Sequence, residues 1–232
     1  MTVTTMEHTL AEDLLLLALN DAGATTSRTK TEVGLAGALL VDLGRGDALH
    51  QQNGRLFAMQ GAAPSHPALA RTHALIATSG RQQGAKSWVR RLRWELKPIT
   101  ATVAGPLVER GVLASQRSTV LGLIHTTLYP QADPGPRDAL RRGLREVLRG
   151  ERDAAEREAL LLGLLVPLGF VGKLVDRADR RAATRRAKAV ADGGLAGTAV
   201  ADTIRDLQAA VVAAVSASAA GASGGDGGGG GG

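Results

Sequence analysis

The sequence lacks cysteine, has very few aromatic residues and contains no long hydrophobic run. Without cysteine, the chain can form neither a disulfide framework nor a thiolate metal site, and it is compatible with a reducing cytoplasm. Aromatic residues make up only 2% of the 232 residues, which argues against a base-stacking platform for single-stranded nucleic acid. The longest apolar run, Ala159 to Gly172, is shorter than the roughly 20 residues that cross a bilayer. These absences favour a cytoplasmic protein that is soluble or peripheral to a membrane.

Motifs that carry enzyme chemistry are also missing. No nucleophile elbow, dinucleotide fingerprint or Walker motif occurs, and GAKS at 84–87 lacks the spacing of a phosphate-binding loop. The histidines are scattered, without the i, i+4 spacing of helical metal ligands: His8, His50, His66, His73 and His125. We therefore expect a protein that is not an enzyme and that uses neither a metal nor a cofactor.

The charge of the chain is strongly positive, with a formal net charge of +6 and an isoelectric point near 10.4. Such a charge indicates a polyanionic partner, either nucleic acid or an anionic membrane surface, or else a basic face that is only solvated. Most basic residues are arginines, and alanine and glycine are abundant. That composition is typical of a high-GC bacterial genome, so the arginines are weak evidence for phosphate recognition.

One stretch, TKTEVGLAGALLVDLG at 29–44, is apolar on nearly every face and should be the central helix of the fold. Thr29 and Glu32 have the spacing of a capping box at its start, and Gly44 is a suitable stop. The fold class that follows is mainly α. We expect a single-domain helical bundle in which amphipathic helices wrap the central apolar helix, with one or two short β-hairpins.

Caps and helix breakers predict the other helices. Thr9 and Glu12 form a second capping box before a helix at 10–19. Ser87 should cap the helix at 87–97, and Asp153 with Glu156 should cap a helix that continues through Leu165. Further helices are expected at 67–78, 99–110, 137–149, 171–192 and 198–217. The helical domain should therefore span 9–217, after a flexible N-terminus at 1–8 and before a disordered, glycine-rich tail at 218–232.

Two segments have the pattern of β-hairpins. Asn53-Gly54 lies between strands expected at 48–52 and 55–59, and both residues tolerate the positive φ of a tight turn. The second hairpin, 112–125, has strands at 112–114 and 119–125 and carries apolar side chains on both faces of its second strand: Val120, Leu121, Leu123 and Ile124. It therefore needs another apolar surface, either a second copy of the protein or the bilayer, unless it folds back onto the bundle.

The helix expected at 87–97 is strongly basic and holds both tryptophans, Trp88 and Trp94. Its cationic residues are Arg90, Arg91, Arg93 and Lys97. Tryptophan among cations suits a membrane interface, with the ring at headgroup level and the charges on anionic lipid. The alternative is that both rings pack inward as part of the core.

Six segments together carry a family resemblance: DLLLLALNDAG (13–23), GLAGALLVDL (34–43), LVERGVL (107–113), LLLGLLVPLGF (160–170), ATRRAK (183–188) and AVVAAV (210–215). By their order and spacing, the chain resembles a bacterial, actinobacterial member of the Golgi phosphoprotein 3 (GPP34 domain) family. The resemblance implies a mainly helical domain whose protruding hairpin serves oligomerisation and membrane contact. It also implies a peripheral membrane protein that binds phosphatidylinositol 4-phosphate in a shallow basic pocket.

In that family the pocket uses one tryptophan and three arginines, and these positions fall on or near Ser27, Ala36, Lys97 and Thr100. Lys97 keeps the positive charge, and Arg28 lies beside the tryptophan position. The expected headgroup site comprises Lys97, Arg28, Arg90, Arg91, Arg93 and Trp88. We therefore expect a non-enzymatic protein at the inner face of the membrane. Its partners would be an anionic, phosphoinositide-like phospholipid and a second copy bound through the 112–125 hairpin.

A competing hypothesis comes from the helix at 99–110 and the hairpin after it, an order that also occurs in winged-helix DNA-binding domains. A helix that reads a DNA groove needs several exposed Arg, Lys, Asn or Gln side chains. This helix offers only Arg110, so nucleic acid is the less favoured partner.

Overall fold

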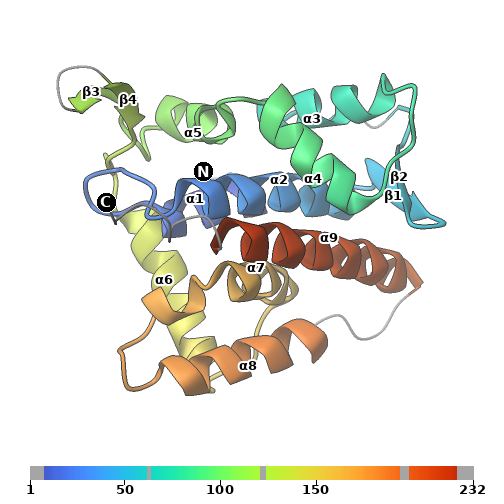
Figure 1. Ribbon diagram of the computed structural model, residues 1–232. Helices are drawn as coiled ribbons and strands as arrows, with labels where there is room; N and C mark the ends of the chain where they lie inside the picture. Colours follow the sequence, from blue (N-terminus) through green and yellow to red (C-terminus); the bar gives the residue numbers. More distant parts are fainter. Residues whose placement is uncertain (1–7, 62–63, 121–123, 194–198, 224–232) are drawn as a thin grey trace, which may run out of the picture.

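The computed structural model describes residues 8–61, 64–120, 124–193 and 199–223, which form a mainly α-helical fold with two short hairpins (Figure 1). The helices within these ranges are α1 Leu10–Ala18, α2 Arg28–Arg45, α3 Pro67–Ala77, α4 Ala85–Glu95, α5 Ile99–Glu109, α6 Gly135–Arg149, α7 Glu156–Leu168, α8 Arg180–Gly193 and α9 Ala199–Ser223. The strands are β1 Leu49–Gln52, β2 Arg55–Ala58, β3 Gln116–Val120 and β4 Ile124–Leu128. The predicted fold class is confirmed.

Helix α2 runs through the middle of the molecule, with α3, α4 and α5 on one side and α7 and α9 on the other (Figure 1). Every residue from Val33 to Gly44 is buried, because neighbouring helices cover all faces of this stretch. Glycine lets α9 approach closely, since a Cβ built on Gly37 would lie 2.7 Å from the side chain of Val215. The prediction of a central apolar helix is therefore confirmed.

The two predicted capping boxes have different outcomes. At α1, the Thr9 hydroxyl accepts from the Glu12 N–H and the Glu12 carboxylate accepts from the Thr9 N–H, as predicted. The second box is wrong: α2 begins at Arg28, its N-cap is Ser27, and Thr29 lies inside the first turn. Glu32 is free for another role because no cap uses it.

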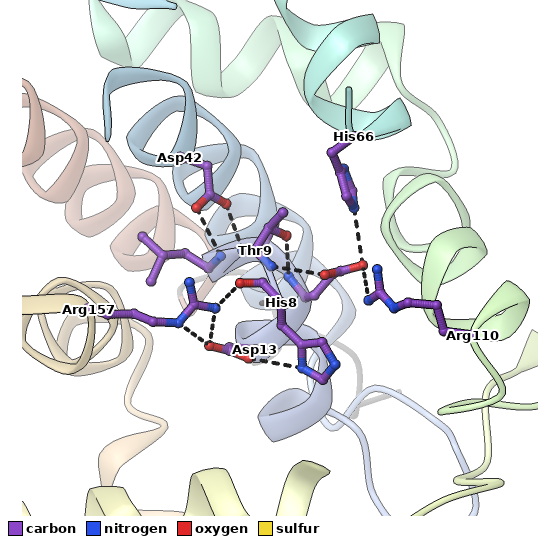
Figure 2. Close-up of polar contacts among 10 residues, drawn as sticks. His8, Thr9, Asp13, Asp42, His66, Arg110 and Arg157 are labelled. Carbon is purple, nitrogen blue, oxygen red and sulfur yellow. Dashed lines mark hydrogen bonds and ion pairs between the residues drawn. The ribbon is translucent and has the colours of Figure 1, made fainter. Parts of the chain in front are cut away.

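Buried carboxylates tie α1 to its neighbours (Figure 2). Glu12 is fully buried and accepts from Arg110 after α5 at 2.7 Å and from His66 at 3.1 Å. Burial alone would raise the pKa of Glu12, but these hydrogen bonds and the Thr9 N–H lower it below its ordinary value. Asp13 accepts from Arg157 of α7 at 2.6 Å. These ion pairs fix the position of α1 against α5 and α7.

Asp42, near the end of α2, caps α1 from outside that helix (Figure 2). Its two carboxylate oxygens accept the backbone N–H groups of Leu10 and Ala11 at 3.0 and 3.1 Å, which satisfies donors that a helix start leaves unpaired. Burial raises the pKa of Asp42 to about 6, although both hydrogen bonds oppose the change.

Several predicted helix boundaries are corrected. Helix α4 begins at Ala85 behind Gly84, so Ser87 is not its cap, and α7 is capped at Ala155 rather than Asp153. The helix predicted at 171–192 is two elements, a single 3-10 turn at Val171–Lys173 and then α8, because turns and a bend at 174–179 separate them. Helix α9 continues to Ser223, six residues beyond the predicted end at 217.

The first hairpin matches its prediction and the second does not. Asn53 and Gly54 have φ of 51° and 72°, so both central residues of the β1–β2 turn use the left-handed region. In the second hairpin β3 pairs with β4, and Thr119 faces His125 across the ladder. The residues predicted to form one strand at 119–125 therefore belong partly to β3 and partly to β4. Leu113, predicted to be in a strand pair, is buried and bridges to Gln131.

Candidate functional site

A pocket of roughly 540 Å³ lies where the start of α2 meets the start of α5 and the end of β4. Arg28 and Glu32 of α2, Pro98 and Thr100 at α5, and Thr126 of β4 line it. The loop before α2 closes one side through Gly23, whose carbonyl accepts the Tyr129 N–H at 2.9 Å. Gly23 has a φ of 79° and lies so close to the Tyr129 and Pro130 backbone that no side chain would fit there.

Two guanidinium groups share one carboxylate in this pocket. Glu32 accepts from Arg28 at 2.9 Å and from Arg93 of α4 at 3.2 Å. The side chain of Arg28 is 72% exposed, whereas that of Glu32 is 18% exposed. Because the pair of arginines outnumbers the carboxylate, this cluster keeps a net charge of +1.

The start of α2 adds further positive potential. The Ser27 side chain makes no capping hydrogen bond, so the first N–H groups of this 18-residue helix lack a side-chain acceptor. The helix dipole places partial positive charge at the same end. This arrangement favours an anion beside Arg28.

Helix α4 presents a basic surface next to the pocket. Trp94 is 72% exposed, and the Lys97 ammonium lies 5.3 Å from the centre of its ring. Arg90, one turn before Trp94, is also exposed. Lys97 directly precedes Pro98 of the pocket lining, and Arg93, the neighbour of Trp94, donates to Glu32 of the lining, so this basic surface adjoins the pocket.

Trp88 does not belong to this surface, and its assignment as a headgroup contact is corrected. Its side chain is fully buried, because Trp88 lies on the apolar stripe that α4 turns toward the core with Val89 and Leu92. Arg91 is directed away from the pocket as well: it covers the Trp88 ring at 5.2 Å and donates to Ser79 at 3.0 Å. The helical spacing of Trp88 with Leu92 was the signal for burial.

The four family positions fall at different depths. Thr100 lines the pocket and Lys97 stands at its edge, while Ser27 precedes α2 as its N-cap. Ala36 is fully buried two turns into α2, where it contributes packing rather than charge. Sequence reasoning missed Glu32, which it had assigned to a cap, and the threonines Thr25, Thr126 and Thr127.

The sequence model of Golgi phosphoprotein 3 (GPP34) matches residues 10–207, from the start of α1 into α9. The chain belongs to the Golgi phosphoprotein 3 family. This match includes every residue named at the pocket. No curated protein matches the chain.

The winged-helix alternative loses its one basic residue in this member of the Golgi phosphoprotein 3 family. The Arg110 guanidinium is 2.7 Å from buried Glu12, so it is committed to the fold. Of α5 itself, only Glu109 is exposed, and its carboxylate would repel a DNA phosphate. Among the described helices, none is both long and apolar enough to span a bilayer.

Proposed function

We propose that this chain is a non-enzymatic peripheral membrane protein that binds anionic lipid headgroups from the cytoplasmic side. The observation that carries the proposal is the position of one pocket between the cationic start of α2 and the exposed Trp94 with Lys97. A headgroup phosphate beside Arg28 would accept hydrogen bonds from the uncapped backbone N–H groups at the start of α2. The Trp94 ring would lie at headgroup level, and each nearby cation would contribute about 1 kcal/mol on an anionic surface.

The lining also bears on which headgroup binds. The family resemblance implies a phosphoinositide, and an inositol ring presents several hydroxyl groups. Glu32 can accept hydrogen bonds from such hydroxyls, and the Thr25, Thr100 and Thr126 side chains can both donate and accept. The negative charge of Glu32 also offsets the positive charge of one arginine, which reduces the attraction of the pocket for a second phosphate group. We therefore propose an inositol phospholipid as the preferred anionic lipid.

Liposome cosedimentation tests the proposal. Phosphatidylcholine vesicles would carry equal fractions of phosphatidylglycerol, phosphatidylinositol or phosphatidylinositol 4-phosphate, at stepped salt concentrations. We expect binding only to anionic vesicles and weakening with salt, because the charges are exposed. Arg28→Gln should weaken binding about five-fold, the equivalent of roughly 1 kcal/mol.

Arg55→Gln is the matched control, since Arg55 is exposed on β2 at the opposite end of α2 (Figure 1). Binding that ignores anionic lipid at low salt would overturn the proposed function. Equal binding to phosphatidylglycerol and phosphatidylinositol would leave a membrane-binding protein but remove the preference for inositol. If Arg28→Gln and Arg55→Gln lose vesicle binding equally, the pocket is not the lipid-binding site.

Self-association through the 112–125 hairpin is a further part of the proposal. It rests on the sequence alone: Leu121 and Leu123 lie outside the described residues, and the side chains of Val120 and Ile124 are not described either. The hairpin is next to the pocket through β4. A second copy held there would bring two headgroup pockets to one membrane and raise avidity.

A further inference from the structure

A second and larger cavity lies on the other side of α2 from the headgroup pocket. Helices α7, α8 and α9 line a half-open cavity of about 780 Å³, and Lys30 of α2 also lines it. Arg28 and Glu32 face the headgroup pocket, so the first turn of α2 separates the two sites. A volume of this size is typical of pockets that bind small molecules.

Most of the cavity lining has no hydrogen-bonding capacity to offer a ligand. Val166 and Pro167 of α7 face Val212 of α9, and alanines fill much of the remainder. Two hydroxyl groups in the lining donate within their own helices, Thr184 to the Arg180 carbonyl and Ser216 to the Val212 carbonyl, each at 2.8 Å. An unbranched hydrocarbon chain suits such walls better than a peptide backbone or a sugar, whose polar groups would lose their hydrogen bonds to water.

One largely buried polar side chain of the lining has no hydrogen-bond partner within the described residues. Gln208 of α9 is only 5% exposed, and its amide makes no hydrogen bond to the parts of the chain that the structure describes. Gly163 of α7 makes room for it, because a Cβ there would lie 2.9 Å from the Gln208 Nε2. The Gln208 amide is not among the fully enclosed polar atoms that lack a partner, so water in the cavity reaches it, and a ligand bonded to the amide would replace that water.

Cations surround the same cavity. Lys188 lines it from α8, and Arg181 and Arg185 continue the basic surface outward along that helix. In the described part of the chain these three side chains have no ion-pair partner. The acidic residue of the lining, Asp192, is exposed at the end of α8.

Lys30 lies near a second lysine, Lys173, and its side chain makes no ion pair within the described residues. Burial, and after it the charge of Lys30, lowers the pKa of Lys173. The cavity lining therefore has Lys30 and Lys188 against a single aspartate, and it favours a negatively charged ligand.

We propose that this cavity binds a long-chain carboxylate, with the hydrocarbon chain between α7 and α9 and the carboxylate at Gln208 and Lys188. The amide N–H groups of Gln208 and the Lys188 ammonium donate to the carboxylate. Along α9, the lining extends from Gln208 to Ala220, which is about 18 Å of helix at 1.5 Å per residue. The site is separate from the headgroup pocket and does not depend on its function.

Calorimetric titration of the full chain with octanoate, decanoate and dodecanoate, below their micelle concentrations, tests the proposal. Affinity should rise roughly four-fold for each added methylene that becomes buried. Dodecan-1-ol, which has the same chain without the charge, should bind more weakly than dodecanoate. Lys188→Gln should lose several-fold in affinity for dodecanoate, whereas Lys86→Gln, an exposed lysine on α4, should bind as the wild type does.

Two substitutions probe the interior of the cavity. Val212→Phe should fill it and abolish binding, and Gln208→Leu should weaken carboxylate binding more than alcohol binding, because the amide N–H groups bond more strongly to a charged acceptor. Circular dichroism would check folding, and Ala209→Leu, at an exposed lining position, replaces Val212→Phe if that variant is unfolded. Affinity that is independent of chain length, or unchanged in both folded filling variants, would overturn the proposal. Loss of vesicle binding in these variants without any binding of free carboxylate would assign the cavity to a bilayer acyl chain instead.

Discussion

At Glu32, two guanidinium groups meet a single carboxylate, Arg28 at 2.9 Å and Arg93 at 3.2 Å. The carboxylate orients both arginines, but it also accepts hydrogen bonds from guanidinium N–H groups that could otherwise donate to a lipid phosphate. Its side chain is mostly buried, so solvent screens the carboxylate less than it screens Arg28. A single residue thus limits how strongly the pocket attracts negative charge.

Glu32→Gln should therefore tighten binding to vesicles that contain phosphatidylglycerol by about five-fold at low salt, since it adds one net positive charge next to the headgroup. Cosedimentation measures the change, and binding should become more sensitive to salt. Glu151→Gln, an exposed position between α6 and α7, changes the total charge equally and serves as the control. Weaker binding in Glu32→Gln would contradict the prediction and mean that orientation of the arginines matters more than their charge.

Asp42 predicts an unusual pH dependence of stability. Its pKa rises from 3.8 to about 6 on folding, so between these values the folded state binds more protons than the unfolded state. This residue therefore favours folding below about pH 4, and its contribution is lost as the pH rises toward 6, by about 3 kcal/mol at most.

Asp42→Asn stays uncharged, so its free energy of unfolding should increase relative to the wild type as the pH rises from 4 to 7. Urea titrations of both proteins at several pH values measure this difference. The opposite pH dependence of Glu12, whose pKa is lowered, is common to both proteins and cancels. A difference that does not vary with pH would show that Asp42 is ionised throughout.

Among the elements, α4 has two tryptophans in opposite environments. Trp88 is enclosed by the core, while Trp94 is largely in water next to Lys97. If this surface meets the membrane, anionic vesicles should shift the tryptophan emission to shorter wavelength, because the Trp94 ring leaves water. Trp94→Phe should abolish the shift and weaken binding, and Trp88→Phe should retain the shift. A shift that persists in Trp94→Phe would place the contact elsewhere.

The sequence predicted an element correctly where the pattern involved only residues that are neighbours in the chain. The capping box at Thr9 and the Asn53-Gly54 turn depend on neighbouring residues, and both were predicted correctly. At Thr29 a similar cap pattern failed, because Arg28 and Arg93 from two helices compete for Glu32. The break between 171–173 and α8 was missed because a helical pattern continues through it.

The site was only partly predictable for the same reason. Arg28 and Lys97 lie at or beside the pocket, as expected from the family positions. Trp88 and Arg91 are residue types that suit a lipid headgroup. The orientation of α4, however, places Trp88 in the core and Arg91 over the Trp88 ring. Gln208 had no sequence signal, since an amide on an alanine-rich helix becomes notable only when the fold shows it 5% exposed in the lining of a cavity.

For the whole molecule, the 112–125 hairpin predicts contact with a second copy or with the bilayer. Replacing Val120 and Leu121 with Ser should leave the far-UV helical signal intact, because β3 and β4 lie at the edge of the fold (Figure 1). Self-association or vesicle binding should fall, as the apolar surface for either contact is removed. Light scattering of the wild-type protein without lipid separates the two effects. A folded double variant with unchanged mass and binding would exclude this role for the hairpin.

The first turn of α2 forms a common wall, with Arg28 and Glu32 on one side and Lys30 on the other. Any thermodynamic coupling that this wall carries between two ligands is reciprocal. Whatever factor a fatty carboxylate applies to the affinity for the membrane, the membrane must apply to the affinity for the carboxylate. With such coupling, the residence time of the protein on the bilayer would depend on the concentration of free fatty carboxylate.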